Sequence, residues 1–145
     1  EENLDAFTQR FLKLAADEII PEQMTPQIDI DAVLDLQDIN SKFMSELKKM
    51  NPFGPDNQKP VFCSLGVKDY GPSKLVGKDL EHIKLELIDD KSNTPIHGIA
   101  FGMRQHNTHI KNMKPFNICY TIEENTYNGN TSLQLMVKDI KENDI

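Results

Sequence analysis

The chain has 145 residues, of which 38% are hydrophobic and 27% charged, values typical of one soluble domain or two small ones. No run approaches the roughly 18 consecutive apolar residues that a membrane span needs. The first residues also lack the basic and apolar regions of a signal peptide. We therefore expect a cytoplasmic protein that does not work at a membrane.

The net charge of −7 is carried by the front of the chain. Residues 1–57 hold 5 Lys and Arg against 12 Asp and Glu, whereas residues 58–145 hold 11 of each. Within the second part, residues 59–114 carry more Lys and Arg than Asp and Glu, which gives a mild positive field suited to phosphate. An ordinary solvated surface is the alternative interpretation.

The first expected element is a helix that Asn3 caps and Pro21 ends. Its apolar positions recur every three to four residues on one face: Leu4, Phe7, Phe11, Leu14 and Ala15. After a linker from Pro21 to Pro26, Ile28 and Ile30 alternate with polar residues, as in a short half-buried strand.

A second helix is expected from Asp35, its cap, towards Pro52, with an apolar stripe made of Ile39, Phe43, Leu47 and Met50. These elements expose more apolar surface than they can cover. Residues 1 to about 50 therefore resemble the tail of a larger domain, or they pack on the module that follows. The chain opens on Glu1 rather than on methionine, which favours a piece of a longer protein.

Turn-forming residues are densest from Asn51 to Asn57, where we place a domain boundary. The predicted domains are residues 1–57 and residues 58–145. From Val61 onward the apolar residues recur with a period of two, and strand-like runs lie near residues 61–70, 80–89, 95–103, 116–127 and 130–140.

Five strands, with a short helix expected within residues 104–115, match the five-stranded Greek-key barrel of the OB type, which places a helix between its third and fourth strands. The predicted fold class is therefore α+β. A helical segment with one short strand comes first, and a five-stranded OB-like Greek-key β-barrel follows.

Asn128-Gly129 lies between two β-rich runs and predicts a type I′ hairpin turn, with Tyr127 opposite Asn130. This register gives one apolar and one polar face. The expected core face holds Ile118, Tyr120, Ile122, Leu133, Leu135 and Val137. The expected wet face holds Thr121, Glu123, Asn125, Ser132, Gln134 and Lys138.

The second barrel strand should bury Ile83, Leu85 and Leu87. In the third, we expect Ile99, Phe101 and Met103 in the core. Gly98, Ala100 and Gly102 would then lie on the opposite side, where small residues allow a backbone or a base to approach or the strand to bend. Cys63 and Cys119 lie among strand-like residues and are expected as reduced core cysteines.

The residues carry no convincing catalytic or metal centre. His106 and His109 are three apart but have no acidic partner nearby in the sequence. Strand alternation and helix capping explain the acidic row Asp29, Asp31, Asp35 and Asp38 better than a magnesium site does. We therefore expect no catalytic residue, no metal ligand and no cofactor within these residues.

Binding of single strands requires only a basic groove and planar groups on which bases stack. In an OB barrel the ligand crosses the second and third strands, between the first-to-second and fourth-to-fifth loops. The candidate nucleic-acid-binding residues at these places are Lys68, Tyr70, Lys74, Lys84, Arg104, Tyr127 and Asn128. A solvated lysine, or an aromatic ring that covers a barrel end, is the alternative for each.

The string PFGPDNQKPVF, from Pro52 to Phe62, resembles the pattern at the start of the barrel of RecJ exonucleases: Pro-Phe-Gly, two residues, Asn, two residues, Pro, any residue, Phe. HIKLEL from His82, GIAFGM from Gly98 and ENTYNGNTSLQLMVKDI from Glu124 resemble that family's C-terminal barrel in order and spacing. The first helix and Ile28-Asp29 are similar to the end of its DHH-associated domain. The resemblance covers almost the whole chain.

This resemblance implies the single-stranded DNA-binding accessory module of a 5′→3′ single-strand DNA exonuclease that acts in DNA repair and recombination. The parent's catalytic DHH domain, with Mn²⁺ or Mg²⁺, would lie upstream, so no catalytic residue is carried over. The implied partners are single-stranded DNA, the upstream catalytic domains of the same chain and single-strand-binding protein. The alternative is a protein-interaction or architectural domain that braces the catalytic core or docks single-strand-binding protein.

Overall fold

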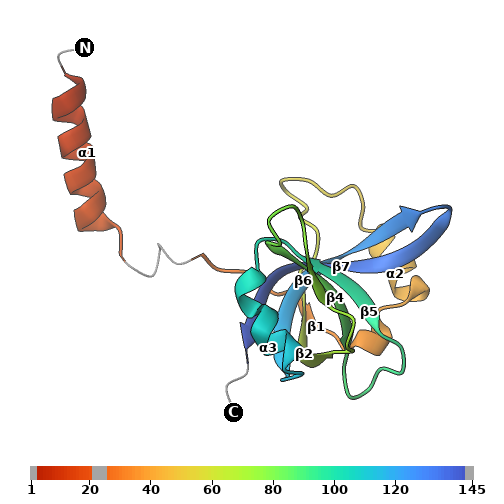
Figure 1. The fold of residues 1–145 in the computed structure, drawn as a ribbon. Coiled ribbons are helices and arrows are strands. Elements are labelled where there is room, and N and C mark those ends of the chain that lie inside the picture. The colour runs from red at the N-terminus through yellow and green to blue at the C-terminus, as the bar shows by residue number, and fades with distance from the viewer. Residues whose placement is uncertain (1–2, 21–25, 143–145) are drawn as a thin grey trace.

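A computed structural model describes residues 3–20 and 26–142 (Figure 1). The helix α1 stands apart from the rest of the protein, in which the strands form a β-barrel and the other helices lie around it (Figure 1). In chain order the elements are α1 (Leu4–Glu18), β1 (Ala32–Val33), η2 (Leu36–Asp38), α2 (Ser41–Lys48), β2 (Phe62–Asp69), β3 (Lys74–Val76), β4 (His82–Ile88), β5 (Ile96–Ala100), η3 (Arg104–His106), α3 (Asn107–Lys111), β6 (Phe116–Tyr127) and β7 (Asn130–Glu142).

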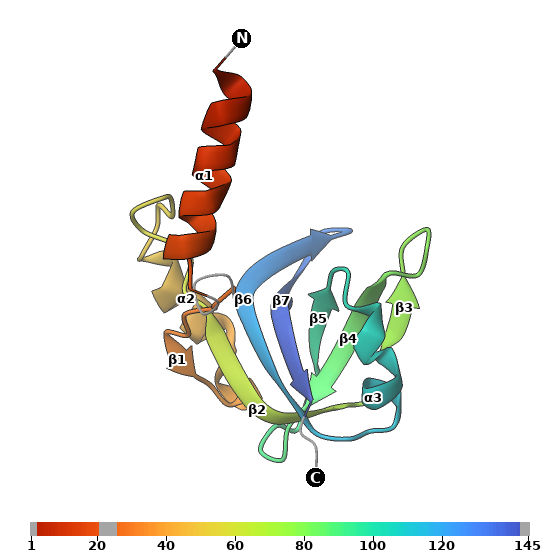
Figure 2. The ribbon, with the colours of Figure 1, turned by 90° about the vertical axis from the view of Figure 1, so that its left-hand side faces the viewer.

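Five strands close into a ring, which confirms the predicted OB-like barrel. β4 pairs with β2 and β5, β5 pairs in parallel with β7, and β6 joins β7 to β2. Figure 2 shows the ring, with η3 and α3 between β5 and β6, where an OB fold places its helix. β1 and β3 extend the sheet beyond the ring. The sequence missed β3 because three residues are too few to display a period of two.

The last hairpin has the predicted register, with Tyr127 opposite Asn130. Asn128 and Gly129 have φ of 50° and 79°, the positive values that a type I′ turn requires. A β-bulge between Cys119 and Tyr120 then shifts the pairing by one residue. Below the bulge, Ile118 lies opposite Ile140, and both are buried.

Thr121 is buried, although we expected it on the wet face. It lines a cavity of about 320 Å³ together with Met44 of α2 and Pro60. The segment before the barrel therefore covers the outer side of β6, and the two-residue period of a hairpin contains no information about such a cover.

The expected orientation of β5 was wrong, because Gly98 and Ala100 face the core and Phe101 is 55% exposed. A Cβ atom on Gly98 would lie 3.5 Å from the Cβ atoms of both Leu85 and Leu135. The interior of a small barrel has no room there for a larger side chain. Met103 packs against the core as expected.

The helix α2 begins later than predicted. Asn40 caps it, since its Oδ1 accepts hydrogen bonds from the N–H groups of Lys42 (3.0 Å) and Phe43 (3.1 Å). Neither Asn3 nor Asp35 caps a helix with its side chain. The carboxylate of Asp35 instead contacts the ammonium of Lys91 at 2.8 Å, which explains why it is not a cap.

The short strand expected around Ile28 and Ile30 lies instead at Ala32–Val33, which pairs with β2. The polar and apolar alternation placed it a few residues too early. Three residues of the front segment, Leu36, Ile39 and Leu47, belong to the barrel's buried cluster. This part of the front segment packs on the barrel, whereas the division into domains at residue 57 stays a prediction.

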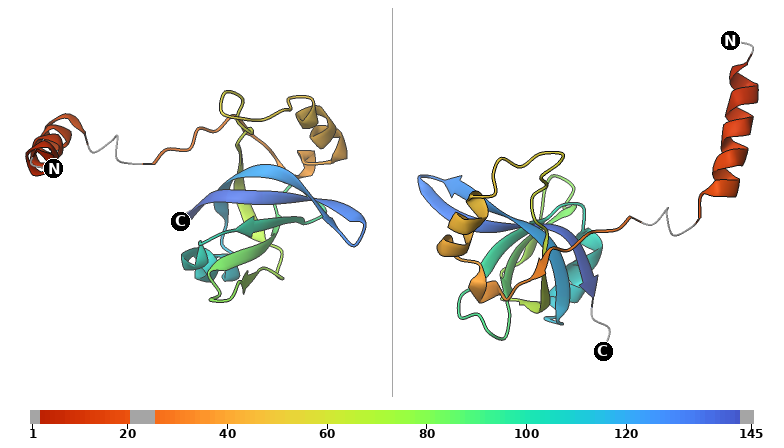
Figure 3. Two further views of the ribbon diagram at one scale, coloured as in Figure 1. Left: turned by 90° about the horizontal axis from the view of Figure 1, so that it is seen from above. Right: turned by 180° about the vertical axis from the view of Figure 1, so that it is seen from behind.

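The helix α1 buries none of its residues, and the views in Figure 3 show it away from the barrel. The apolar face contains Leu4, Phe7, Phe11 and Leu14, each more than half exposed. Among the described residues, no side chain outside the helix covers this face. The expected linker from Pro21 lies largely outside the described residues.

Asp69 at the end of β2 organises the loop that follows. Its Oδ1 accepts hydrogen bonds from the N–H groups of Gly71 (3.0 Å) and Ser73 (3.3 Å), and Lys111 of α3 lies 3.4 Å from its Oδ2. Burial alone would raise the pKa of Asp69. Hydrogen bonds from Ser73 and Gly71, with the Lys111 ammonium, outweigh burial and lower this pKa below its ordinary value.

Asp89 has the same role at the end of β4. Its carboxylate accepts hydrogen bonds from the N–H groups of Leu36 (2.7 Å), Lys91 (3.0 Å) and Ser92 (2.6 Å). Burial opposes ionisation, but these bonds lower the pKa of Asp89 overall. Asp89 thereby ties the front segment to the β4–β5 loop.

At Gly98 a small side chain should be tolerated, whereas a large one should destabilise the protein. Gly98→Ala should change the free energy of unfolding by less than about 1 kcal/mol, because its Cβ meets only ordinary contacts. Gly98→Leu should lower the free energy of unfolding by about 1–3 kcal/mol or more, because it overpacks the barrel. Urea unfolding measures both values. Equal stability of the two variants would contradict the inward orientation.

Asp69→Asn should lower the free energy of unfolding at pH 7 by about 1–3 kcal/mol, because it removes the charge of a buried carboxylate that accepts several hydrogen bonds. The folded pKa of Asp69 is below its ordinary 3.8, so its contribution is complete above that value and is lost as the pH falls through the folded pKa. Denaturant unfolding from pH 7 down to roughly pH 2 should therefore show a narrowing gap between variant and wild type. Asp56→Asn, at an exposed loop position, is the control. A gap that stays constant with pH would contradict this account.

Candidate nucleic-acid interface

The outer surface of β4 and β5 forms one continuous face, which we call the OB face and define by His82, Lys84, Glu86, His97, Ile99 and Phe101. On β4 these residues alternate with the buried Ile83, Leu85 and Leu87. Lys84 lies opposite Ile99, and Glu86 lies opposite His97, so their side chains project to the same side. The OB face therefore lies where OB barrels bind oligonucleotides.

Two lysines lie side by side at the edge of the OB face. Lys74 of β3 is directly opposite Lys84 of β4, and both are exposed. Like charges directly opposite each other destabilise a strand pair. Among the described residues, neither ammonium has a carboxylate partner within ion-pair distance. An anion bound between them would offset the repulsion.

Both histidines of the OB face lie near a carboxylate, one on the face and one just before β4. Nδ1 of His97 lies 3.7 Å from Oε1 of Glu86, and Nε2 of His82 lies 3.3 Å from Oε1 of Glu81. The face is therefore mixed in charge, and its unpaired positive charge is concentrated at the β3 side, on Lys74 and Lys84.

Phe101 supplies an exposed aromatic ring on the same face, two residues after Ile99, the partner of Lys84. The rings of Phe101 and His82 meet edge to face, with centroids 4.9 Å apart. Nδ1 of His82 accepts a hydrogen bond from the N–H of Gly102 at 3.0 Å, which fixes the orientation of the imidazole. Sequence reasoning placed Phe101 in the core. The small residues Gly98 and Ala100 were the indication that the opposite side of the strand faces inwards.

Five of the seven predicted site residues lie on β4 or beside it, spread from Lys68, opposite Ile88 at its end, to Arg104, bonded to Asp79 before its start. Lys74 and Lys84 are adjacent, and Tyr70 is 54% exposed with its N–H bonded to the carbonyl of Glu86. Arg104 follows Phe101 along the chain and donates to the carbonyl of Asp79 at 3.5 Å. Lys68 is engaged by Asp90 at 3.2 Å, so its charge is partly neutralised.

The structure separates Tyr127 and Asn128 from these five residues. β5 and β7 run in parallel with His97 beside Gln134, so the hairpin tip lies beyond the start of β5. Phe101 and Arg104 follow the end of β5. Tyr127 is 74% exposed at that tip. Along the strands, the hairpin tip therefore lies in the direction opposite to Phe101 and Arg104.

Sequence spacing did not reveal the acidic partner of His106 and His109, because Glu142 comes from the end of β7. Its Oε1 lies 2.7 Å from Nδ1 of His106, and its Oε2 lies 3.2 Å from Nδ1 of His109. These contacts fasten α3 to the barrel. Within residues 3–20 and 26–142, no group of His, Cys, Asp and Glu has an arrangement that could hold a metal ion.

The cysteines are free thiols that face each other across β2 and β6, with Cys63 buried and Cys119 half-buried. Burial, followed by the influence of Cys63, raises the pKa of Cys119 to about 11. A thiol with such a pKa is a poor nucleophile near neutral pH. In the part of the chain that the structure describes, no helix is long and apolar enough to cross a membrane.

Comparison with known proteins connects this geometry to a family. Residues 30–139 match the RecJ OB domain family. Curated relatives named single-stranded-DNA-specific exonuclease RecJ are 25% identical over 141 residues in Haemophilus influenzae and 24% identical over 140 residues in Salmonella typhimurium. Each alignment covers 97% of this chain but only 24% of the relative.

Two solved structures have the same fold. They are RecJ from Thermus thermophilus in complex with Mn²⁺ and with Mg²⁺, and both give a TM-score of 0.73 at 17% identity. The alignments cover 99% and 100% of this chain, and 20% and 21% of the solved chains. Since the family match covers residues of every strand and more than half of the chain, this chain belongs to the RecJ OB domain family.

Proposed function

We propose that this chain binds single-stranded DNA on its OB face, as the accessory module of a RecJ-type 5′→3′ single-strand DNA exonuclease. The observation that carries the proposal is the unpaired positive charge of Lys74 and Lys84, directly opposite each other on that face. A phosphate between the two ammonium groups would convert repulsion into attraction.

The aromatic ring on the same face as Lys84 favours a single strand over a duplex. Bases of a single strand are free to stack on an exposed ring, whereas those of a duplex are already stacked on one another. Phe101 is exposed and is held by its contact with His82. Tyr70 offers a second ring on the neighbouring strand end. Such contacts tolerate any sequence, as an exonuclease substrate requires.

We assign the catalytic steps to a part of the parent protein outside this chain, since the chain spans about a quarter of the Haemophilus and Salmonella relatives it matches. The two Thermus structures are described with Mn²⁺ and Mg²⁺. In this proposal, the upstream DHH domain holds such an ion and cleaves the strand in the cytoplasm during DNA repair and recombination. This chain keeps the strand in place.

A second function, bracing the rest of the parent protein, is favoured by α1. Its apolar face, with Phe7 and Phe11 stacked at 6.1 Å, is uncovered by the described residues. A helix of this kind normally buries its apolar face against another element. Attachment to the upstream catalytic domains through α1 is compatible with DNA binding on the barrel. Docking of single-strand-binding protein is the remaining alternative.

Removing the two opposed lysines should weaken DNA binding. We expect Lys74→Ala with Lys84→Ala to lower the affinity for a labelled oligonucleotide about tenfold at low salt, because two phosphate contacts are lost. The slope of log affinity against log salt should become shallower by about 1.4, since each phosphate contact on a single strand contributes about 0.7. Fluorescence anisotropy across a salt series measures both quantities.

The matched control is Lys13→Ala with Lys42→Ala, which removes the same charge from α1 and α2. This pair should leave the salt slope near that of the wild type. If both double variants weaken binding equally, only net charge matters and the proposed face is wrong. If the wild type does not bind at low salt, or prefers duplex, the DNA-binding role is wrong.

The exposed ring should contribute through stacking rather than through charge. Phe101→Ala is expected to reduce single-strand affinity about tenfold without changing the salt slope, because loss of one stacked base costs about 1–3 kcal/mol. Phe101→Trp should retain the affinity. Anisotropy with the same oligonucleotides is the measurement, and thermal unfolding checks that both variants stay folded. If Phe101→Ala binds single strands with unchanged affinity, the ring is not part of the DNA-binding surface.

A further inference from the structure

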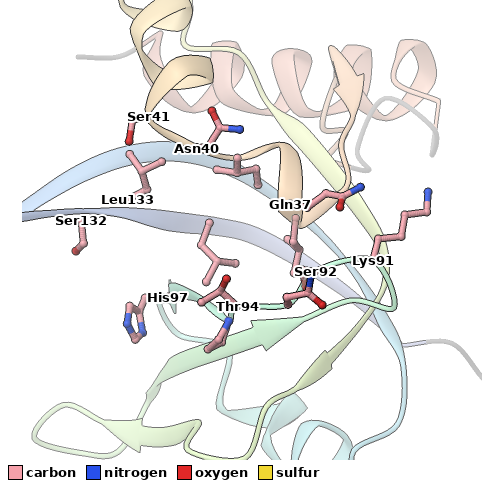
Figure 4. A pocket seen from close by; sticks show the side chains of 14 residues that line it. Gln37, Asn40, Ser41, Lys91, Ser92, Thr94, His97, Ser132 and Leu133 are labelled. Atoms are coloured by element: carbon pink, nitrogen blue, oxygen red, sulfur yellow. The ribbon is translucent and has the colours of Figure 1, made fainter.

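A cavity of about 500 Å³ opens where the front segment meets the barrel (Figure 4). One wall comes from η2 and the start of α2, with Gln37 and Asn40. The other walls come from the β4–β5 loop, with Thr94, and from the strands, with His97 and Ser132. The side chains labelled in Figure 4 surround this space from both sides. This volume is sufficient for a small organic group.

The lining of this cavity is polar but carries little net charge. The labelled residues in Figure 4 mostly bear neutral amide and hydroxyl groups. Lys91 is the one lysine or arginine among the lining residues, and its ammonium contacts Asp35 at 2.8 Å. That hydrogen bond raises the pKa of Lys91, so its charge is permanent but neutralised by its partner. A lining of this kind suits a neutral hydrogen-bonding group better than a phosphate.

Apolar side chains form the remaining surface, including Ile39, Ile96 and Leu133. A flat ligand with apolar faces and hydrogen-bonding edges would match both parts of the lining. A nucleobase has this chemistry, because its faces stack on apolar groups and its edges pair with amides and hydroxyls.

The cavity is continuous with the OB face. His97 belongs to the OB face and also lines the cavity. Gln134 lies beside His97 on β7, and Ser132, two residues earlier, projects to the same side at the cavity. A strand held at Lys74 and Lys84 that crosses β4 and β5 would therefore reach the cavity at the hairpin end.

The walls are fixed by contacts already present. Asp89 ties Leu36 of η2 to the β4–β5 loop through the hydrogen bonds described above. On the other side of α2, Lys48 contacts Glu124 at 2.7 Å and braces the base of the hairpin. A cavity formed in advance reduces the entropy lost when a ligand binds.

We infer that this cavity receives one unstacked base of a single DNA strand that lies across the OB face. The inference rests on the proposed function and adds a base-binding subsite at the hairpin end. Sequence-independent binding is retained, because rotatable amides and hydroxyls can hydrogen-bond to any of the four bases.

A scan with abasic oligonucleotides tests the subsite. The probe is a labelled oligonucleotide of about 12 nucleotides, within the usual site size, with one base removed at each position in turn. With the wild type, removal of the base at one position should reduce affinity about tenfold, in addition to the positions stacked on Phe101 and Tyr70. Ser132→Trp fills the cavity and should lower the affinity for the intact oligonucleotide by the same factor. With Ser132→Trp, removal of the base at that one position should no longer change the affinity, whereas the effects at the other positions should remain.

Gln58→Trp, which places the same ring at an exposed position outside the cavity lining, is the matched control and should behave as the wild type. Thr94→Trp fills the cavity from the opposite wall, so it keeps the test valid if the first variant unfolds. If the wild type binds DNA and both tryptophan variants bind equally well, the subsite is wrong and the proposed function stands. If the wild type does not bind single strands, the proposed function itself is wrong, and the subsite with it.

Discussion

The limited interior of a five-stranded barrel determines which side chains reach solvent. Gly98 and Ala100 occupy the inner side of β5 because Leu85 and Leu135 already fill the space there. The strand alternates, so the larger Ile99 and Phe101 must face outwards. A packing constraint inside the barrel thereby creates the exposed aromatic ring on the surface that we propose for DNA. Core and interface are two results of the same alternation.

Two carboxylates near the end of β4, Asp69 opposite Leu87 and Asp89 directly after Ile88, order the loops beside this strand. Asp69 accepts hydrogen bonds from the N–H groups of the loop before β3. These bonds position Lys74 relative to Lys84. Asp89 accepts hydrogen bonds from N–H groups of the β4–β5 loop and of the front segment. These bonds hold together two walls of the cavity at the hairpin end. Each uses one charge to order several backbone groups, which fixes a loop without a large core.

The sequence predicted the parts of this fold that depend on local chemistry. The Asn128-Gly129 turn determined the hairpin register, and period-two patterns located the five ring strands. The predictions were wrong where tertiary packing decides which side of a strand is buried. The inward side of β5 depends on Leu85 and Leu135, residues distant in sequence, and the burial of Thr121 depends on a segment that folds back over β6. The opposed lysines depend on β3, which is too short to predict. The cavity combines three separate parts of the chain, so no local pattern could indicate it.

The strand β3 has only three residues and pairs only with β4, at the edge of the sheet. Its pairing places Lys74 opposite Lys84. Without DNA, the few hydrogen bonds of this short strand must therefore hold two like charges close together. We expect this edge to open more readily than the ring, and a polyanion to close it. Hydrogen exchange of the β3 amides would then report whether the surface is occupied, even though β3 itself contributes little to the barrel.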